Sequence, residues 1–363
     1  MGRQLLLVLA VTFTVLLAGC AGLGVGDDSL DDLPGSDEPE INSETNENDT
    51  DHTDDSAETV ADTDGELEIH HIDVGQGDAT FIIIPGGETI LIDSGDWRQS
   101  GQQVIEYLDE LGVEQIDHLV ATHGHADHIG GHDEIIAYYE TEHDGIGAAY
   151  DSGVAATSQT YERYLDAIEE YDVELFEVEE GDELPIEDEQ LTALVLNPPA
   201  GNSGTDLHAN SVSIVFEFSE FRYLTTGDAE TAAEQRMIDD WADELEADAY
   251  HAGHHGSSTS STEPFMNEVQ PSIAIISSGY DSQYGHPHDE VLERFDEFGI
   301  ETYWTGVHGD IVLVTGGEAI DVETTNSFST NPLDLLDEKP RDDDETHSIV
   351  ANAFEVHAPL IAS

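Results

Sequence analysis

Short apolar runs alternate along the chain with longer stretches in which apolar residues recur every three or four positions. The runs predict strands, and the helical spacing predicts helices. We expect strands at 67–74, 79–84, 88–93, 116–121, 191–196, 211–218, 221–226 and 272–277, and helices at 101–111, 159–171, 229–245, 262–269 and 288–298. This alternation is typical of an α/β protein whose sheets are covered by helices. It occupies residues 66–321, a length that suits a single domain.

The N-terminus has a different pattern. Residues 5–18 are almost wholly apolar, follow Arg3 and end at Leu-Ala-Gly-Cys, 17–20. Because a membrane span needs about 20 apolar residues, this shorter run predicts a secretory signal peptide over residues 1–20. Its ending resembles a lipobox, which implies cleavage and lipidation of Cys20. We therefore expect a lipid-anchored domain on the extracellular face of the plasma membrane; an uncleaved anchor would give the same location.

Two further segments lack the apolar periodicity of a folded core. Residues 21–65 are rich in Gly, Asp, Glu, Ser, Thr and Asn, which predicts a disordered, charge-extended tether. Residues 322–363 form a C-terminal extension with an acidic run at 333–345. We interpret this extension either as a flexible tail or as a short docking element, and assign it no catalytic role.

Charge indicates the conditions in which the protein works. The chain carries 82 Asp and Glu residues against 8 Lys and Arg residues, a formal net charge of -74, and Lys339 is its only lysine. Such self-repulsion destabilises a compact state in dilute buffer, whereas molar salt shortens the screening length to about 3 Å. We interpret the composition as that of an extreme halophile's protein. Disorder of the core is the rival interpretation, but 38% of the residues are hydrophobic and fall in periodic runs.

The same charge limits how a nucleic acid is bound. A nuclease at low salt usually gains affinity from counterion release through a basic groove, which this composition excludes. Molar salt removes most of that contribution for any protein. DNA is therefore not excluded as a substrate, although tight or long-footprint binding is disfavoured.

The strongest chemical signal is Thr-His-Gly-His-Ala-Asp-His-Ile-Gly-Gly at 122–131. It places His123, His125, Asp127 and His128 within six residues, and each would need a partner if buried. After a strand, the first two imidazoles can lie on one side while the other two groups face a second point. A solvated loop or a single structural metal are the alternatives, but structural zinc sites usually close with thiolates, and Cys20 is the only cysteine.

Several motifs together resemble the metallo-β-lactamase superfamily, across roughly residues 66–316. They are His-x-His-x-Asp-His in the loop, Leu-Ile-Asp-Ser-Gly at 91–95, Thr-Gly-Asp-Ala at 226–229 and Gly-His-His-Gly-Ser at 253–257. The resemblance implies a four-layer αββα sandwich of two mixed sheets flanked by helices. It also implies that Asp93 supports the metal loop, that Asp228 bridges two metals and that His254 is the last ligand.

Other motifs resemble one branch, the ComEC-like metallo-hydrolases of DNA uptake. They are His-Ile-Asp-Val-Gly-Gln-Gly-Asp-Ala at 71–79, His-His-Gly-Ser at 254–257 and Tyr-Gly-His-Pro-His at 284–288. This resemblance implies phosphodiester cleavage, with DNA as the substrate.

The implied ligands form two sets that share one carboxylate. His123, His125 and His208 hold one divalent ion, Asp127, His128 and His254 hold the other, and Asp228 bridges them. His208 is the only histidine between His143 and His251, and an exposed loop histidine is its alternative reading. Asn210, nearby, is expected to orient a substrate or a ligand. Nitrogen and oxygen donors without thiolate fit zinc, manganese or iron.

The two ions would activate a shared water as nucleophile and polarise the electrophile. The catalytic candidates are Asp127, Asp93, His255 and His286. Asp93 and Asp73 are expected to accept hydrogen bonds from ligand imidazoles, with turn chemistry as the alternative for each. His255 and His286 are expected at the rim, to protonate a leaving oxygen or bind phosphate, with a structural role as the alternative.

These observations predict a two-metal phosphodiesterase that handles extracellular DNA, for nutrition or uptake. The alternative enzyme keeps the site but attacks a lactone, thioester or β-lactam carbonyl. A non-catalytic surface lipoprotein that binds a ligand or a membrane channel is the alternative from another class. No later apolar run reaches about 20 residues, so a transport role would need another protein as the DNA channel.

Overall fold

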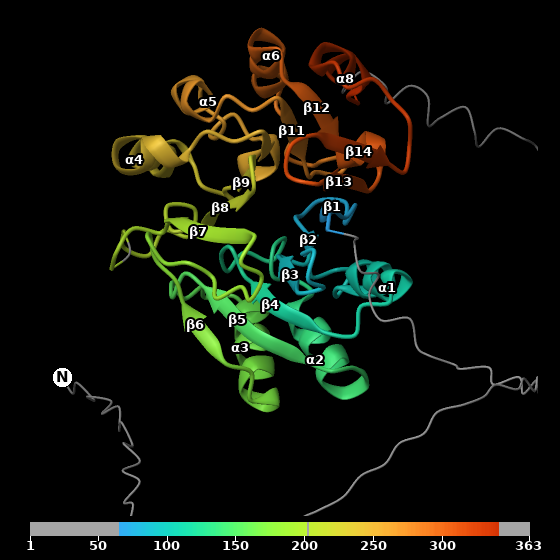
Figure 1. The fold of residues 1–363 in the computed structure, drawn as a ribbon, viewed down its shortest axis with the longest axis vertical. Helices are drawn as coiled ribbons and strands as arrows, with labels where there is room; N and C mark the ends of the chain where they lie inside the picture. The colour runs from blue at the N-terminus through green and yellow to red at the C-terminus, as the bar shows by residue number, and fades with distance from the viewer. Residues whose placement is uncertain (1–64, 202, 341–363) are drawn as a thin grey trace, which may run out of the picture. The chain divides into compact units, whose positions relative to one another are not determined.

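The computed structural model describes residues 65–201 and 203–340, which form two β-sheets packed face to face with helices on both outer faces (Figure 1). Cys20, the predicted signal peptide 1–20 and the predicted tether up to residue 64 lie outside the described residues, as does the end of the chain from 341. Within the described ranges, no helix has the length and apolar character that a bilayer span requires.

The first sheet has eight strands in the order β14-β13-β1-β2-β3-β4-β5-β6. They are β1 (Leu67–His71), β2 (Thr80–Ile83), β3 (Thr89–Ile92), β4 (Ile116–Val120), β5 (Ile146–Asp151), β6 (Leu175–Glu177), β13 (Ile311–Thr315) and β14 (Ile320–Thr324). Strands β14 to β3 pair antiparallel, whereas β3 to β6 run parallel.

The second sheet has six strands in the order β12-β11-β10-β9-β8-β7. They are β7 (Leu191–Asn197), β8 (Ser213–Phe218), β9 (Phe221–Thr225), β10 (Ala249–His251), β11 (Ile273–Ile276) and β12 (Glu301–Trp304). Strands β7 to β9 pair antiparallel and β9 to β12 run parallel. Both sheets are therefore mixed and share one plan, with an antiparallel part followed by a parallel part.

Helices cover the outer face of each sheet (Figure 1). Those on the first sheet are α1 (Gln102–Leu111), α2 (His132–Glu142) and α3 (Gln159–Tyr171); those on the second are α4 (Thr231–Trp241), α5 (Glu263–Val269), α6 (Asp289–Phe298) and α8 (Pro332–Glu338). The short α7 (Thr305–His308) follows β12, and 3-10 turns cover Ala242–Glu244 and Gly253–Gly256. The predicted four-layer αββα sandwich is confirmed.

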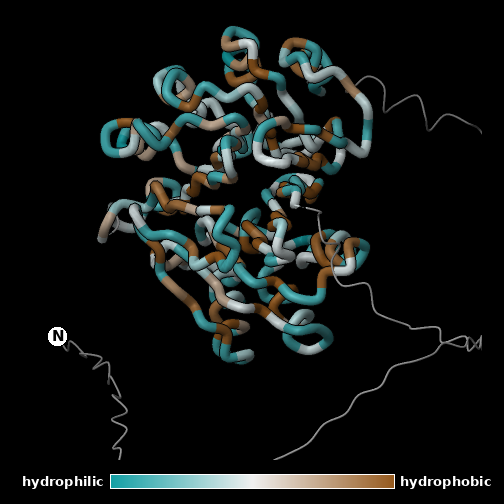
Figure 2. The backbone as a smooth tube through the Cα atoms, viewed as in Figure 1, coloured by the Kyte–Doolittle hydropathy of each residue, from teal (hydrophilic) through white to brown (hydrophobic). Residues whose placement is uncertain are grey.

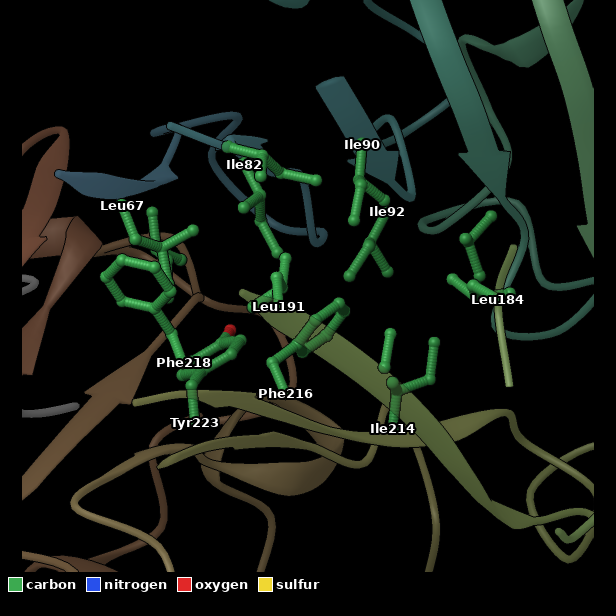
Figure 3. Close-up of a cluster of buried hydrophobic side chains, with 14 of the residues drawn as sticks. Leu67, Ile82, Ile90, Ile92, Leu184, Leu191, Ile214, Phe216, Phe218 and Tyr223 are labelled. Atoms are coloured by element: carbon green, nitrogen blue, oxygen red, sulfur yellow. The ribbon is translucent and has the colours of Figure 1, made fainter. Parts of the chain in front are cut away.

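Three apolar cores separate the four layers. One lies between the sheets, where Ile82 and Ile90 face Ile214 and Phe216 (Figure 3). The other two lie between each sheet and its helices. Consecutive residues of a strand point to opposite faces, so Leu91 packs under the helices while its neighbour Ile90 packs between the sheets. With both faces covered, such strands are continuously apolar, as their sequences are.

The helices combine one buried face with one exposed face, so hydrophobic and hydrophilic residues alternate along them (Figure 2). In α6, Val291, Leu292 and Phe295 are buried among acidic neighbours, which is the spacing that predicted this helix.

The C-terminal extension is partly folded. The expected boundary after residue 321 falls inside β14. Beyond it, α8 packs on α6, and the Leu335 side chain is fully buried in the core under the helices. The described part of the extension, up to residue 340, thus belongs to the sandwich, because Leu335 fills space that the helix layer would otherwise leave open.

Candidate metal centre

The candidate ligands lie where strands end. The metal loop follows β4, Asp93 follows β3, Asp228 follows β9 and the turn Gly253–Gly256 follows β10. These four strands belong to the parallel parts of the two sheets. In sheets of this kind the carboxyl ends of the strands are the usual place for a binding site, and here the loops of both sheets meet.

The metal loop is held by the loop that follows β3. Ser94 N donates to the His128 carbonyl over 2.6 Å, and Gly130 N donates to the Gly95 carbonyl over 2.9 Å. The two backbones approach so closely that a Cβ on Gly130 would lie 2.1 Å from the backbone nitrogen of Trp97. Only glycine fits there, which accounts for the glycine pair that ends the loop.

The first cluster consists of His123, His125, His208 and Asp228, each with a potential ligand atom within 4.8 Å of the others. His123 Nε2 lies 2.8 Å from His125 Nδ1 and 3.5 Å from Asp228 Oδ2, and His208 Nε2 lies 3.7 Å from the same oxygen. Burial lowers the pKa of His123 well below its usual value, and also lowers the pKa of His125. Both rings are therefore neutral, the form that binds a metal.

The second cluster consists of Asp78, His128, Asp228 and His255. His128 Nε2 lies 3.1 Å from Asp228 Oδ1, and His255 Nε2 lies 3.8 Å from the same oxygen. Asp127, another predicted ligand, has its Oδ2 3.4 Å from His255 Nε2. The two oxygens of Asp228 thus face different clusters, Oδ2 the first and Oδ1 the second.

Several of these atoms are buried without a partner. His128 Nε2, His255 Nε2, Asp78 Oδ1 and Asp228 Oδ1 are inaccessible to solvent, and none makes a hydrogen bond within the described part of the chain. An unsatisfied buried polar atom costs about 1–3 kcal/mol, so a convergent set of them indicates a group that binds them together. Two ring nitrogens and carboxylate oxygens are a donor set that fits a divalent cation.

Electrostatics point the same way. Burial disfavours the charged forms of His128 and His255. The neighbouring carboxylates outweigh burial and raise the pKa of both rings well above its usual value. These carboxylates are Asp228 and Asp93 beside His128, and Asp78 and Asp228 beside His255. Asp228 keeps a pKa well below its usual range despite its burial, through His128 and His255. In the described residues the ion pairs of Lys and Arg all lie elsewhere. Protons on these two rings therefore balance the carboxylates where a divalent cation would otherwise do so.

The structure exchanges the predicted places of His254 and His255. His254 was expected beside Asp127 and His128, and His255 at the rim. Both have left-handed backbone conformations, φ 50° and φ 57°, and this turn leaves His255 1% exposed in the second cluster. The side chain of His254 is 20% exposed, and its ring centroid lies 4.6 Å from that of His208.

His254 belongs to a third group with His208 and Glu230. Its Nδ1 lies 3.3 Å from Glu230 Oε1, and its Nε2 lies 3.5 Å from Asp228 Oδ2. Thr259 Oγ1 donates to Glu230 Oε1 over 3.0 Å. Burial lowers the pKa of His254. The ring therefore connects an outer carboxylate with the shared one.

Asp93 lies where it was predicted to support the metal loop. Its Oδ2 accepts from His128 Nδ1 over 2.7 Å and from Thr122 Oγ1 over 2.7 Å, and its Oδ1 accepts from Thr122 N over 2.9 Å. Asp73 was also expected to accept a hydrogen bond from a ligand imidazole. Its carboxylate instead accepts from Gly75 N over 3.0 Å and closes a turn.

Sequence reasoning missed Asp78, which lies within the second cluster. Asp78 is 3% exposed, and its Oδ1 lies 3.4 Å from His255 Nδ1 and 3.5 Å from His251 Nε2. Its backbone nitrogen donates to the Asp127 carbonyl over 3.2 Å. The Gly-Gln-Gly-Asp motif that carries it was noted only as a family likeness, and was the available signal.

Two more predicted residues, Asn210 and His286, lie in loops near the centre. Asn210 is fully buried. Its Oδ1 accepts from Ser203 N over 2.7 Å and its Nδ2 donates to the Asp206 carbonyl over 2.7 Å, so it shapes the loop that carries His208.

His286 is 7% exposed, with its ring centroid 5.9 Å from that of His255. Burial and the surrounding imidazoles lower the pKa of His286 to about 3.

Comparison with known proteins decides the family. The model of the metallo-beta-lactamase superfamily matches residues 72–280. The chain belongs to the metallo-beta-lactamase superfamily. ComE operon protein 3 of Bacillus subtilis (strain 168) is 32% identical over 262 residues, covering 68% of this chain and 33% of the relative. Competence protein ComA of Neisseria gonorrhoeae is 28% identical over 248 residues, covering 67% and 32%.

The chain spans about a third of the length of these curated relatives. Among solved structures, the metallo-beta-lactamase fold protein YhfI from Bacillus subtilis covers 66% of this chain and 96% of its own, with a TM-score of 0.45 and 10% identity. The predicted membership and the likeness to competence proteins are confirmed. The chain is a metallo-beta-lactamase-fold hydrolase with a His/Asp cluster compatible with a divalent metal site.

Proposed function

We propose that the chain is a two-metal phosphodiesterase that cleaves DNA outside the cell in high salt. The proposal rests on the carboxylate of Asp228, whose two oxygens face two separate groups of imidazoles. A carboxylate shared in this way suits a pair of ions, whereas a single structural ion would leave one group of buried nitrogens without a partner.

The ligand sets follow from the contacts. His123, His125 and His208 would hold one ion, and Asp78, His128 and His255 the other with Asp127 beside them, while Asp228 is shared. Zinc or manganese ions held there would supply a nucleophile from water near neutral pH and polarise the electrophile. This assignment places His255 among the ligands and frees His254 for another role.

The outer contacts set which nitrogen of each ring faces the centre. His128 Nδ1 donates to Asp93 over 2.7 Å, and His255 Nδ1 donates to the Ser277 carbonyl over 3.0 Å. Each ring must then present Nε2 as its lone-pair donor to the centre. These hydrogen bonds therefore orient both rings for metal binding before an ion is bound.

His254 is proposed to take a proton from water at the centre, because burial lowers the pKa of its ring and leaves it neutral. Glu230 lies 3.3 Å from its Nδ1 and can keep that nitrogen protonated, while Nε2 faces the shared carboxylate of Asp228. Its side chain is still 20% exposed, so water can reach Nε2. Proton transfer by a positioned imidazole typically contributes 10²–10⁴-fold to rate.

DNA is proposed as the substrate because the relatives include named competence proteins. The lack of a basic groove is consistent with work in molar salt, where counterion release contributes little to any nuclease. The predicted signal peptide and lipidated Cys20 support a place on the extracellular face of the plasma membrane. Uptake through a membrane channel would then need a partner protein.

A substrate panel in molar KCl tests the proposal. The purified chain, loaded with zinc or manganese, is assayed on single-stranded DNA, double-stranded DNA, phosphodiester reporters and lactones, with Asp228→Asn as the matched variant. We expect about two metal equivalents per chain and phosphodiester cleavage that the variant loses. Cleavage of lactones alone would favour a carbonyl substrate, and full metal loading without turnover would favour a binding protein.

A further inference from the structure

We propose that a pocket beside the metal centre binds one unpaired nucleobase against the exposed rings of Trp97 and Tyr284, so that the site selects single-stranded nucleic acid. This inference rests on the proposed phosphodiesterase function and names the form of its substrate.

The pocket adjoins the metal centre directly. It has a volume of about 280 Å³, and the residues that line it include Trp97, Gln76, Tyr284 and Asp127. Asp127 also lies beside the proposed ligands, and its 27% exposed side chain lies 3.4 Å from His255. A base in the pocket would therefore leave its own phosphate next to the ligands.

The two aromatic rings are exposed at this place. Trp97 is 47% exposed and Tyr284 is 56% exposed, whereas most large apolar side chains of the described chain are buried. Such rings offer flat faces to a base and accept any base, because every base has a π-face. The Arg98 guanidinium lies 5.0 Å from the centre of the Trp97 ring, and its charge is balanced by Asp96, whose Oδ2 lies 2.9 Å from Arg98 Nη1.

Two uncharged amide side chains, Gln76 and Gln99, line the pocket. Both amide atoms of Gln76 and the Oε1 of Gln99 are buried without a hydrogen-bond partner in the described residues, so a rotation of either side chain would present them to a base. An amide can donate to and accept from a base edge. Since neither stacking nor a neutral hydrogen bond is removed by screening, both suit a protein that works in molar salt.

Both rings are held by the loops that form the metal centre. Trp97 N donates to the carbonyl of Ala126, the residue before Asp127, over 3.1 Å. The ring of Tyr284 lies 5.7 Å from that of His286, which in turn lies 5.9 Å from His255. The pocket is thus positioned by the same contacts as the ligands and needs no separate support.

Strand preference follows from the availability of base faces. In a duplex the bases stack on one another, and a base must be unstacked and unpaired before it can enter a pocket. An unpaired strand avoids that cost. A site built on aromatic rings and amides therefore favours single strands, whereas a site built on phosphate contacts alone would not.

Trp97 itself provides the first test. Of the three tryptophans, Trp97 is exposed and Trp304 is fully buried, so stacking should quench the fluorescence of Trp97. The full, metal-loaded chain in molar KCl is titrated with cleavage-resistant phosphorothioate oligothymidylate. We expect quenching that is absent in Trp97→Phe and absent with an abasic oligomer of equal length. Equal quenching by the abasic oligomer would overturn the proposal.

Kinetics with single-stranded DNA provide the second test. We expect Trp97→Ala and Tyr284→Ala each to raise KM at least about fivefold with kcat nearly unchanged, while Trp97→Phe retains a low KM. Phe176→Ala is the matched control, because Phe176 is 46% exposed and lines a different groove. Duplex DNA should bind more weakly than single strands.

The outcomes separate this inference from the proposed function. Cleavage of phosphodiesters with an unchanged KM in both alanine variants would overturn the stacking pocket and leave the phosphodiesterase intact. Quenching by oligothymidylate without cleavage of any phosphodiester would support the pocket and overturn the proposed reaction. Duplex binding as tight as single-strand binding would also count against the pocket.

Discussion

His128 donates from Nδ1 to Oδ2 of Asp93 over 2.7 Å, although the two residues follow different strands, β4 and β3. Asp93 has a left-handed backbone, φ 59°, and also accepts two bonds from Thr122 at the start of the metal loop. One carboxylate thus sets the course of the loop and the orientation of a ligand. The contribution of Asp93 to metal affinity can therefore be measured by metal binding alone, without an activity assay.

Asp93→Asn should weaken metal binding while the fold persists. The amide removes the negative charge that holds the His128 ring in place, and loss of such an outer contact typically costs 10–100-fold in metal affinity. Competition with a chromogenic chelator measures the change. Asp73→Asn is the control, because the carboxylate of Asp73 only closes a turn with Gly75. Equal affinity in both variants would refute the role assigned to Asp93.

His255→Ala and His254→Ala should fail in different ways. We expect His255→Ala to lose close to one metal equivalent per chain, because His255 faces the second cluster. We expect His254→Ala to retain both ions but to lose about 10²–10⁴-fold in kcat, as is typical when a positioned proton acceptor is removed. Elemental analysis and single-turnover rates distinguish the two. Metal loss in His254→Ala alone would restore the original assignment from sequence.

The exchange of these two histidines shows the limit of sequence reasoning at the site. The motif Gly-His-His-Gly-Ser predicted a ligand, but neighbouring residues can face either way. The choice depends on the left-handed backbone at both His254 and His255, which no periodicity reports. Asp73 and Asp78 pose the same problem, since both lie in one glycine-containing loop and only the fold decides which reaches an imidazole.

Many elements with one plainly apolar face were predictable. The helix expected at 159–171 has those bounds, and each expected strand lies within three residues of its predicted ends, whereas β5, β6, β10, β12, β13 and β14 were not predicted. Helix α2 was missed because its buried face includes His132 and Tyr139. His132 bonds with Ser94 Oγ over 2.6 Å, so a buried partner replaces the apolar signal that a pattern search detects.

Glu234 should make stability depend on pH. It is 1% exposed on α4 and accepts from Thr262 N over 3.1 Å and Thr262 Oγ1 over 2.6 Å. Burial nevertheless raises its pKa to about 7. Between its unfolded value near 4.5 and about 7, the folded state binds the proton and the unfolded state does not. Stability from this group is therefore full at the acid end and declines as pH rises to about 7, by up to about 3 kcal/mol.

Chemical unfolding of the wild type and Glu234→Gln, at pH 5 and pH 8 in constant molar KCl, checks this. The wild type should lose more stability than the variant over that interval, whatever the offset between them. Glu293→Gln, on the exposed face of α6, should follow the wild type. Parallel pH profiles for all three proteins would contradict the assigned pKa.

Gly130→Ala should destabilise the sandwich and disorganise the metal loop together. The added Cβ would lie 2.1 Å from Trp97 N and 2.4 Å from the Ala126 carbonyl oxygen, and both are backbone atoms that cannot rotate away. Overpacking of this kind costs about 1–3 kcal/mol or more. Gly316→Ala is the control, because nothing lies within 4 Å of a Cβ built there. Thermal unfolding in molar KCl should show a lower Tm for Gly130→Ala, with weaker metal binding, and an unchanged Tm for Gly316→Ala. Equal Tm values would mean that the two loops can separate, and the metal loop would then owe its shape to the bound ions rather than to its contact with the loop after β3.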